Sequence, residues 1–284
     1  MHIGYIVLAY KSPAQILRLL SRVATGESSV AVHVDRIMDG EQYHELRRRA
    51  EELGDVHFLD RTRTYWGGFG LVRATIGALD HLLMNDALDY AVLLTGQDYP
   101  LRSSREIEAS LRGAGGRSFL HNSPLPYAAW GPGGGLERVA RWHLMRARPY
   151  RVRVPWKREI PGGLKAYGGE AYWCLSRAAA EHVSLFVRRN PRFLRFFEHV
   201  FVPDELFFQT IVMNSELRDE VVNDTLHFVD WNAEPGPAIL TSRDLSRLEG
   251  SEKLFARKFD LDVDPEVLDR LDEHARAADR GVRS

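Results

Sequence analysis

Two adjacent carboxylates, Asp204 and Glu205, lie in the segment FVPDELFFQT between hydrophobic runs. Acidic side chains seldom lie among aromatic residues unless a partner or a function holds them there. Asp204 follows a proline, so we expect it to cap the next helix, with Glu205 in the first turn, where the helix dipole favours an acid. The nearby Phe207 and Phe208 would also raise the proton affinity of Glu205 towards that of a general base. The local pattern leaves both interpretations of Glu205 open.

A second group of chemically able residues lies in LFARKFDLDVD, near the C-terminus. Lys258, with Arg257, has the charge to neutralise a phosphate. The alternative is a strand edge whose cations pair with Asp260 and its neighbours. The DLD and DVD triplets have the spacing of a divalent-cation motif, but they follow FARKF rather than a central strand, which favours solvated acids.

Two further acids end predicted strands. Asp35 in VHVDR either caps a turn or accepts hydrogen bonds from a base or ribose, and Asp98 in TGQDYPL belongs either to a turn or to a ligand site. His33 and Asp35 share one strand face, but a hydrogen-bonded histidine is the favoured interpretation over a metal ligand.

The segment from Arg138 to Arg158 holds eight basic residues and no acid. Such runs are usually solvated. The interleaved Trp142, Tyr150 and Trp156 would also suit RNA or stacked sugar rings. Because the net charge of the chain is −1, there is no global field to recruit nucleic acid or an anionic membrane, and nucleic acid ranks low.

These residues need a scaffold, and the hydrophobic pattern predicts one. Strands are expected at 3–9, 30–34, 56–59 and 90–95, with helices from Pro13, over 40–53 and over 69–84; a strand near 226–229 and a helix from Pro265 follow. Residues 122–169 have little regular pattern. Alternating strands and helices predict an α/β fold with a mainly parallel sheet covered on both faces, and ligands bind at the carboxyl ends of such strands.

Composition and missing motifs exclude several classes of protein. The 284 residues are 44% hydrophobic and 27% charged, an ordinary globular balance, and Cys174 is the only cysteine, so no intramolecular disulfide forms. GxGxxG after the first strand, GxxxxGK[ST], GxSxG and HExxH do not occur. No long apolar segment or basic leader is present, so we expect a soluble, cytoplasmic protein.

Taken together, several segments resemble one family, the core-2/I-branching β-1,6-N-acetylglucosaminyltransferases and peptide O-xylosyltransferases (glycosyltransferase family 14). The matching segments, in family order, are AYK, VHVD, YWGGFGLVRATIGAL, LLTGQDYPL, GGEAYWCLSR, VPDELFFQT, DW and LFARKFDLDVD. The resemblance implies a GT-A-like fold in a single domain over 1–284, with a nucleotide-binding half at 1–120 and an acceptor-binding and catalytic half at 121–284. The chain looks like a bacterial-type soluble member.

The resemblance also implies chemistry: inverting transfer from a UDP-sugar to a hydroxyl without a divalent metal or other cofactor. Glu205 matches the catalytic base, and Lys258 matches a lysine that stabilises the departing diphosphate. The family's partner arginine falls here near Pro235, so Arg243 or Arg257 would take its place. The other implied contacts are Ala9, Tyr10, Asp35, Tyr65, Trp66 and Asp98 for the nucleotide sugar, and Glu137, Arg141, Tyr172 and Trp173 for the acceptor.

Three functional hypotheses remain at this point. The first is a UDP-sugar-dependent transferase, with UDP-GlcNAc as the leading donor and UDP-xylose as the alternative. The second is a non-catalytic sugar-nucleotide or glycan-binding protein, because a fold does not guarantee activity. The third is RNA binding by the basic segment. The acceptor, whether glycan, peptide or small molecule, and the oligomeric state are not encoded in recognisable motifs.

Overall fold

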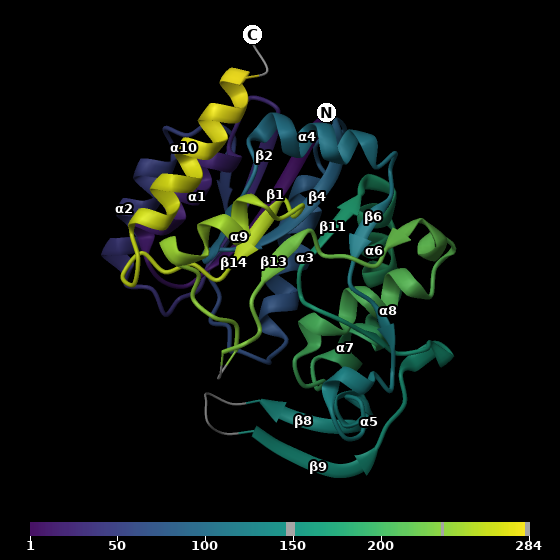
Figure 1. Ribbon diagram of the computed structural model, residues 1–284. Helices are drawn as coiled ribbons and strands as arrows, with labels where there is room; N and C mark the ends of the chain where they lie inside the picture. The colour runs from purple at the N-terminus through teal and green to yellow at the C-terminus, as the bar shows by residue number, and fades with distance from the viewer. Residues whose placement is uncertain (146–150, 234–235, 282–284) are drawn as a thin grey trace.

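A computed structural model describes residues 1–145, 151–233 and 236–281 (Figure 1). Tyr150 and Pro235, named above, lie outside the described residues. The centre is a seven-stranded sheet in the order β12-β6-β11-β4-β1-β2-β3, in which β11 alone runs against its neighbours. The predicted α/β class with a mainly parallel sheet is therefore confirmed. The strands are β1 (His2–Ala9), β2 (Ser28–Val34), β3 (Val56–Phe58), β4 (Leu88–Thr95), β6 (Ser118–Leu120), β11 (Trp173–Ser176) and β12 (Val221–Val222).

Helices cover both faces of this sheet because its strands are apolar on both sides. One face packs against α1 (Pro13–Val23), α2 (Gly40–Ala50), α4 (Ser104–Gly113), α9 (Leu245–Glu249) and α10 (Glu266–Gly281). The other face packs against α3 (Gly70–Leu82), α6 (Arg177–Arg189), α7 (Pro191–Phe197) and α8 (Phe207–Met213).

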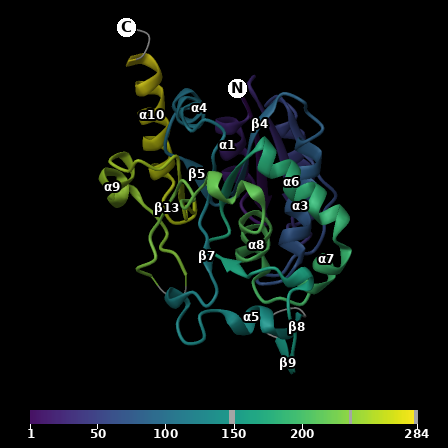
Figure 2. The same ribbon diagram turned by 90° about the vertical axis from the view of Figure 1, so that its right-hand side faces the viewer.

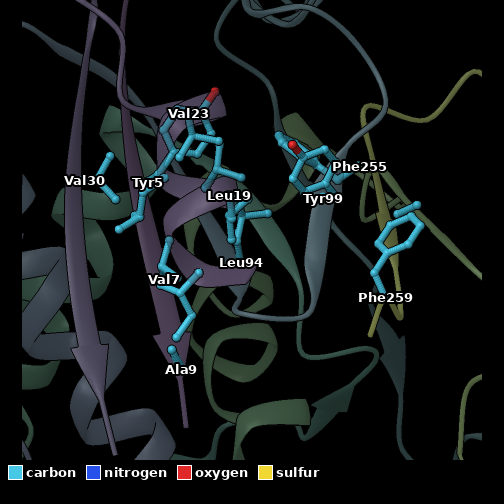
Figure 3. Close-up of a cluster of buried hydrophobic side chains, with 14 of the residues drawn as sticks. Tyr5, Val7, Ala9, Leu19, Val23, Val30, Leu94, Tyr99, Phe255 and Phe259 are labelled. Carbon is cyan, nitrogen blue, oxygen red and sulfur yellow. The ribbon is translucent and has the colours of Figure 1, made fainter. Parts of the chain in front are cut away.

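The first core shows how the pleat and the helix period meet. Successive side chains of β1 point to opposite faces of the sheet. Tyr5 and Val7 lie on the α1 side, whereas Ile6 lies in the core on the other side. Leu19 and Val23 of α1 fill the space beside them, and the C-terminal segment adds the aromatic rings shown in Figure 3. Helix α1 begins at Pro13, as predicted, because a proline loses no helical hydrogen bond at the first position.

A small second sheet brings the C-terminal segment to the carboxyl end of β4. It pairs β13 (His227–Val229) with β14 (Phe255–Arg257) in parallel, and β14 with β5 (Asp98–Pro100) in antiparallel fashion. Gln15, which is buried, donates to the carbonyls of Gly96 and Phe259 at 3.0 and 3.1 Å. Residues distant in sequence are thereby fixed at one edge of the main sheet.

The region 122–169 has more regular structure than its sequence indicates. Besides the short pair β7 (Ser123–Pro124) and β10 (Tyr167–Gly168) and the helix α5 (Leu136–Ala140), it forms an antiparallel hairpin of β8 (Arg141–Met145) and β9 (Arg151–Lys157). The hairpin projects from the body in both views (Figures 1 and 2). Across residues 1–145, 151–233 and 236–281, no helix combines the length and hydrophobicity needed to cross a membrane.

Candidate active site

Asp204 and Glu205 lie in a single 3₁₀ turn, Pro203–Glu205, and α8 begins only at Phe207. Leu206 takes the N-cap position, and no side chain caps the helix, so the prediction that Asp204 is the N-cap is wrong. The turn inserts one residue between the acids and the helix. Asp204 has a buried carboxylate oxygen without a hydrogen-bond partner among the described residues, and burial together with Glu205 raises its pKa from 3.8 to about 7.

Glu205 is held by one arginine. Arg138 of α5 donates from Nη1 to Glu205 Oε2 at 2.6 Å, and its guanidinium lies 3.9 Å from the ring centroid of Trp130. Burial raises the pKa of Glu205, whereas Arg138 lowers it, and the net shift is upward. A carboxylate that is positioned by a hydrogen bond and is more basic than a free glutamate has the properties of a general base.

The backbone before β11 fixes Glu205 from the other side. Gly169 N donates to the carbonyl of Glu205 at 2.9 Å. A Cβ on Gly169 would lie 1.9 Å from the carbonyl oxygen of His121, so only glycine permits this approach. The next residue, Glu170, accepts hydrogen bonds from Trp231 Nε1 at 3.1 Å and Thr225 Oγ1 at 3.4 Å, and its charge contributes to the raised pKa of Glu205.

Arg257 lies beside the carboxyl end of β4, and its side chain is 12% exposed. It donates from Nη1 to Asp98 Oδ1 at 3.0 Å, directly across the β14–β5 pair, and stacks at 4.5 Å on the ring of Tyr172. Asp98 is 0% exposed and also binds the backbone and hydroxyl of Thr95. The expectation that Asp98 contacts the nucleotide sugar therefore needs correction, because its carboxylate is enclosed and orients Arg257 instead.

Lys258 follows Arg257 and is half-buried. Burial, Arg257 and Lys11 together lower its pKa. Lys11, rather than either cation of FARKF, forms the ion pair with Asp260, at 2.6 Å. In the parts of the chain that the structure describes, Lys258 Nζ makes no hydrogen bond or ion pair, and neither does the exposed Arg243. Lys258, Lys11 and Arg257 thus form a cationic group beside the end of β1, with Tyr10 near Arg257.

The remaining predicted nucleotide contacts cluster around the end of β2. Asp35 is buried and accepts from the backbone nitrogens of Ile37 and Thr64, each at 2.7 Å, so the capping interpretation describes its present hydrogen bonds. His33 Nε2 lies 2.9 Å from Thr62 Oγ1, in agreement with the prediction of a hydrogen-bonded histidine. Ala9 is buried and its carbonyl accepts from the nitrogen of Asp35 at 2.8 Å.

Two aromatic residues, Tyr65 and Trp66, lie in the loop after β3. Trp66 is 57% exposed and packs edge-on against Phe201, 5.8 Å away, and the adjacent Gly67 carbonyl accepts from Val202 N at 3.0 Å. Tyr65 is half-buried. The loop after β3 is therefore joined directly to the segment that carries Glu205.

The predicted acceptor contacts are dispersed. Trp173 is fully buried against Phe208 in the core, so it cannot reach an acceptor, and that expectation is wrong. The pattern GGEAYW did not reveal which aromatic residue points inwards. Tyr172 stacks on Arg257, Glu137 is exposed next to Arg138, and Arg141 binds the carbonyl of Pro155 in the hairpin.

A shallow polar pocket of about 260 Å³ opens beside Glu170. Its wall includes Thr225, His227, Trp231 and Lys253. His227 is buried, its Nε2 lies 3.8 Å from Asp98 Oδ2, and burial lowers its pKa. Among the residues described, no three His, Cys, Asp or Glu side chains gather as a possible metal-ligand set.

Sequence reasoning missed Arg138, Glu170 and His227. Arg138 was one cation among eight in the basic segment, so nothing in the pattern distinguished it. Glu170 had a usable signal: an acid directly after two glycines and before a buried strand lies where the backbone makes close contacts.

Comparisons with known proteins identify the family of the chain. Residues 3–249 match the family model described as Core-2/I-Branching enzyme. The chain is 27% identical to Xylosyltransferase 2 of Rattus norvegicus over 298 residues and 27% identical to Xylosyltransferase 2 of Homo sapiens over 296. Each alignment covers 96% of this chain and 34% of the relative, so the chain spans about a third of their length. The solved structure of S. aureus TarS 1-349 aligns at 19% identity over 42% of this chain and 35% of that chain, with a TM-score of 0.32, too low to support an argument.

Proposed function

Because this chain belongs to the core-2/I-branching enzyme family, we propose that it transfers a sugar from a UDP-sugar to an acceptor hydroxyl, with inversion and without a divalent metal. The observation that carries the proposal is the placement of one positioned carboxylate, Glu205, in a fold that also gathers Lys258 and Arg257 beside the strand ends. A base and a cationic group are the two elements that an inverting transfer from a nucleotide diphosphate requires.

In this mechanism Glu205 takes the proton of the acceptor hydroxyl as that oxygen attacks the anomeric carbon. Arg138 occupies Oε2, which leaves Oε1 for the proton. The bond from the anomeric carbon to the diphosphate breaks, and the negative charge grows on the departing UDP. Lys258 stabilises that charge, since its ammonium forms no ion pair within the described part of the chain.

Arg257 is the better candidate for the second cation than Arg243. Its guanidinium lies next to Lys258 and is held rigid by Asp98 and Tyr172, whereas Arg243 is exposed on a 3₁₀ turn. A preorganised charge costs less to orient during the reaction than one on a mobile surface side chain. Arg257 would act mainly through its electrostatic field, because one of its nitrogens already binds Asp98.

We place the acceptor at the pocket beside Glu170. The pocket presents a carboxylate, a threonine and the indole of Trp231, which is 55% exposed, and it adjoins the backbone that holds Glu205. Such a set suits a hydroxyl-bearing compound of saccharide type, since carboxylates accept from hydroxyls and indoles pack on sugar rings. GlcNAc is the favoured donor sugar. Xylose is the second candidate, and its support comes from the curated relatives, which are named xylosyltransferases.

The test is a hydrolysis screen that needs no known acceptor. Purified protein is incubated with UDP-GlcNAc, UDP-xylose, UDP-glucose and UDP-galactose, with and without EDTA, and UDP release is measured. We expect slow release from one donor, altered less than about twofold by EDTA. Loss of turnover in EDTA would reinstate a metal mechanism. UDP-sugar binding by calorimetry, with no hydrolysis and no product across an acceptor panel, would identify a binding protein instead.

A further inference from the structure

Gln15 is a polar side chain on the apolar face of α1, and it is only 1% exposed. Its neighbours on that face, Ile16 and Leu19, pack in the core. Burial of an amide costs free energy unless its polar atoms are hydrogen-bonded. Gln15 offsets this cost with three hydrogen bonds, and all three go to main-chain groups outside α1.

These bonds join the end of β4 to the segment that follows β14. Gln15 Nε2 donates to the carbonyl of Gly96 at 3.0 Å and to the carbonyl of Phe259 at 3.1 Å. Its Oε1 accepts from Leu261 N at 3.0 Å. Gly96 directly follows β4 of the main sheet, and Phe259 directly follows Lys258. One side chain therefore sets where the chain runs immediately after Lys258.

A second buried glutamine, Gln97, holds the same segment. Its Nε2 donates to the carbonyl of Phe259 at 3.2 Å, and its own carbonyl accepts from Phe259 N at 2.9 Å. The carbonyl of Lys258 accepts from Leu240 N at 2.8 Å. The main chain at Lys258 is thus fixed by several bonds, whereas its Nζ makes no hydrogen bond or ion pair with residues 1–145, 151–233 or 236–281.

A fixed main chain limits the region that a lysine ammonium can reach. The stabilisation that a cation gives to a developing charge depends on its position before the reaction, and small displacements weaken it strongly. Fully satisfied buried networks make such positions rigid. Gln15 is enclosed and does not itself reach a substrate, so it would act on bound nucleotide through the segment that it holds.

We propose that Gln15, together with Gln97, is a positioning residue that holds the main chain of Lys258 so that the ammonium lies against the diphosphate of the bound nucleotide. The inference rests on the proposed function, which makes Lys258 the cation at the diphosphate. The alternative is that Gln15 only stabilises the fold. The two roles differ in one measurable respect, because an effect exerted through Lys258 disappears when the ammonium is removed.

The test is a double-mutant cycle in the full chain, with UDP as the probe and its Kd measured by calorimetry. Methionine replaces each glutamine, since it has a similar length but does not form these hydrogen bonds. We expect Lys258→Met to raise the Kd at least about tenfold. Gln15→Met should raise it at least about fivefold when Lys258 is present and less than about twofold in the Lys258→Met background.

Gln97→Met, taken through the same cycle, should give the same pattern and decides the question if Gln15→Met does not fold. Urea unfolding of every variant reports the loss of stability, which a purely structural role would also cause. The stability lost on Gln15→Met should be the same in both backgrounds, whereas the loss of UDP affinity should not.

The matched control is Gln209→Met. Gln209 is also a fully buried glutamine that donates to a main-chain carbonyl, that of Glu170 at 2.8 Å, but it lies in α8 on the opposite face of the main sheet. Whatever its effect on the Kd for UDP, the factor should be equal with and without the ammonium of Lys258.

Equal factors for the Gln15 and Gln97 variants in both backgrounds, or unchanged UDP affinity in both, would overturn the inference. An unchanged Kd in Lys258→Met would overturn it too, because Lys258 would not contact the diphosphate. Failure of the proposed function has a different signature: UDP would bind and the cycle would show the expected pattern, but no UDP-sugar would be turned over. Absence of UDP binding would contradict both.

Discussion

Asp204 and Glu205 are neighbours in the chain but differ in their partners. Glu205 has a guanidinium 2.6 Å from one oxygen, whereas Asp204 has a buried oxygen with no partner among the described residues. The aromatic surroundings visible in the sequence predicted a raised proton affinity for Glu205, and the upward pKa shift agrees. The sequence did not predict that Asp204 is the more perturbed acid, because the 3₁₀ turn that removes it from the helix end depends on tertiary packing.

Asp204 should make the fold less stable as the pH rises. Its folded pKa of about 7 exceeds its ordinary value of 3.8, so the stability contributed by the protonated form is complete below 3.8 and is lost as the pH rises through 7. Asp204→Asn should therefore be more stable than the wild type by about 1–3 kcal/mol at pH 8, with the difference vanishing near pH 4. Urea unfolding measures this, and the exposed Asp219→Asn should show no such trend. Equal stabilities of Asp204→Asn and the wild type at pH 8 would contradict the assignment.

Arg138 should set the pH at which the base works. A base must be ionised, so activity falls as the pH drops through the raised pKa of Glu205, and Arg138 is the group that holds this pKa down. Arg138→Met should move the acid limb of the kcat/KM profile for UDP-sugar hydrolysis to higher pH, while Arg138→Lys should restore much of the shift. A lower kcat/KM with an unmoved limb would mean that Arg138 acts only in binding.

Among the elements, β5 and β14 join the two halves of the chain. The pairing of Arg257 with Asp98 lies between them and is enclosed. The main strands and helices were predictable from periodicity, since β1, β2, β4 and α1 have strong apolar patterns. The short strands β3 and β13 were also predicted, and β14 was anticipated as a possible strand edge. The strand β5 and the hairpin were not, because β5 has too few residues to show a period, and β8 and β9 consist largely of basic and exposed residues.

Removal of the Asp98 carboxylate should destabilise the protein, because it leaves the Arg257 guanidinium without its partner. Asp98→Asn leaves Arg257 enclosed without its carboxylate and should lower the free energy of unfolding by about 3–5 kcal/mol. Arg247→Met removes the ion pair with Asp230 at the surface and should have a much smaller effect, because solvent screens exposed charges. Both values come from urea titration. If both variants lowered the free energy of unfolding by a similar small amount, Asp98 would not be the residue that holds Arg257 in position.

At the scale of the whole molecule, the fold gathers the proposed base, a cationic group and a polar pocket from segments that span most of the sequence. The sheet orders the strand ends, the C-terminal segment supplies Arg257 and Lys258, and α5 supplies the arginine on the base. The order of motifs along the chain predicted the family, and the alternation of strands and helices predicted the mainly parallel sheet. Neither pattern predicted the polar pocket beside Glu170, whose walls come largely from short connections between strands.

The most direct test of the account measures UDP release from the donor found in the screen, together with UDP affinity, for wild type, Glu205→Gln and Glu198→Gln. The last variant changes a glutamate on the nearby α7 end that pairs with Arg73 instead. We predict that Glu205→Gln lowers the rate of UDP release by about 10²–10⁴-fold while its Kd for UDP stays within about threefold of the wild type, and that Glu198→Gln behaves as the wild type does. Turnover retained by Glu205→Gln, or UDP affinity lost along with it, would contradict the assignment of Glu205 as the base.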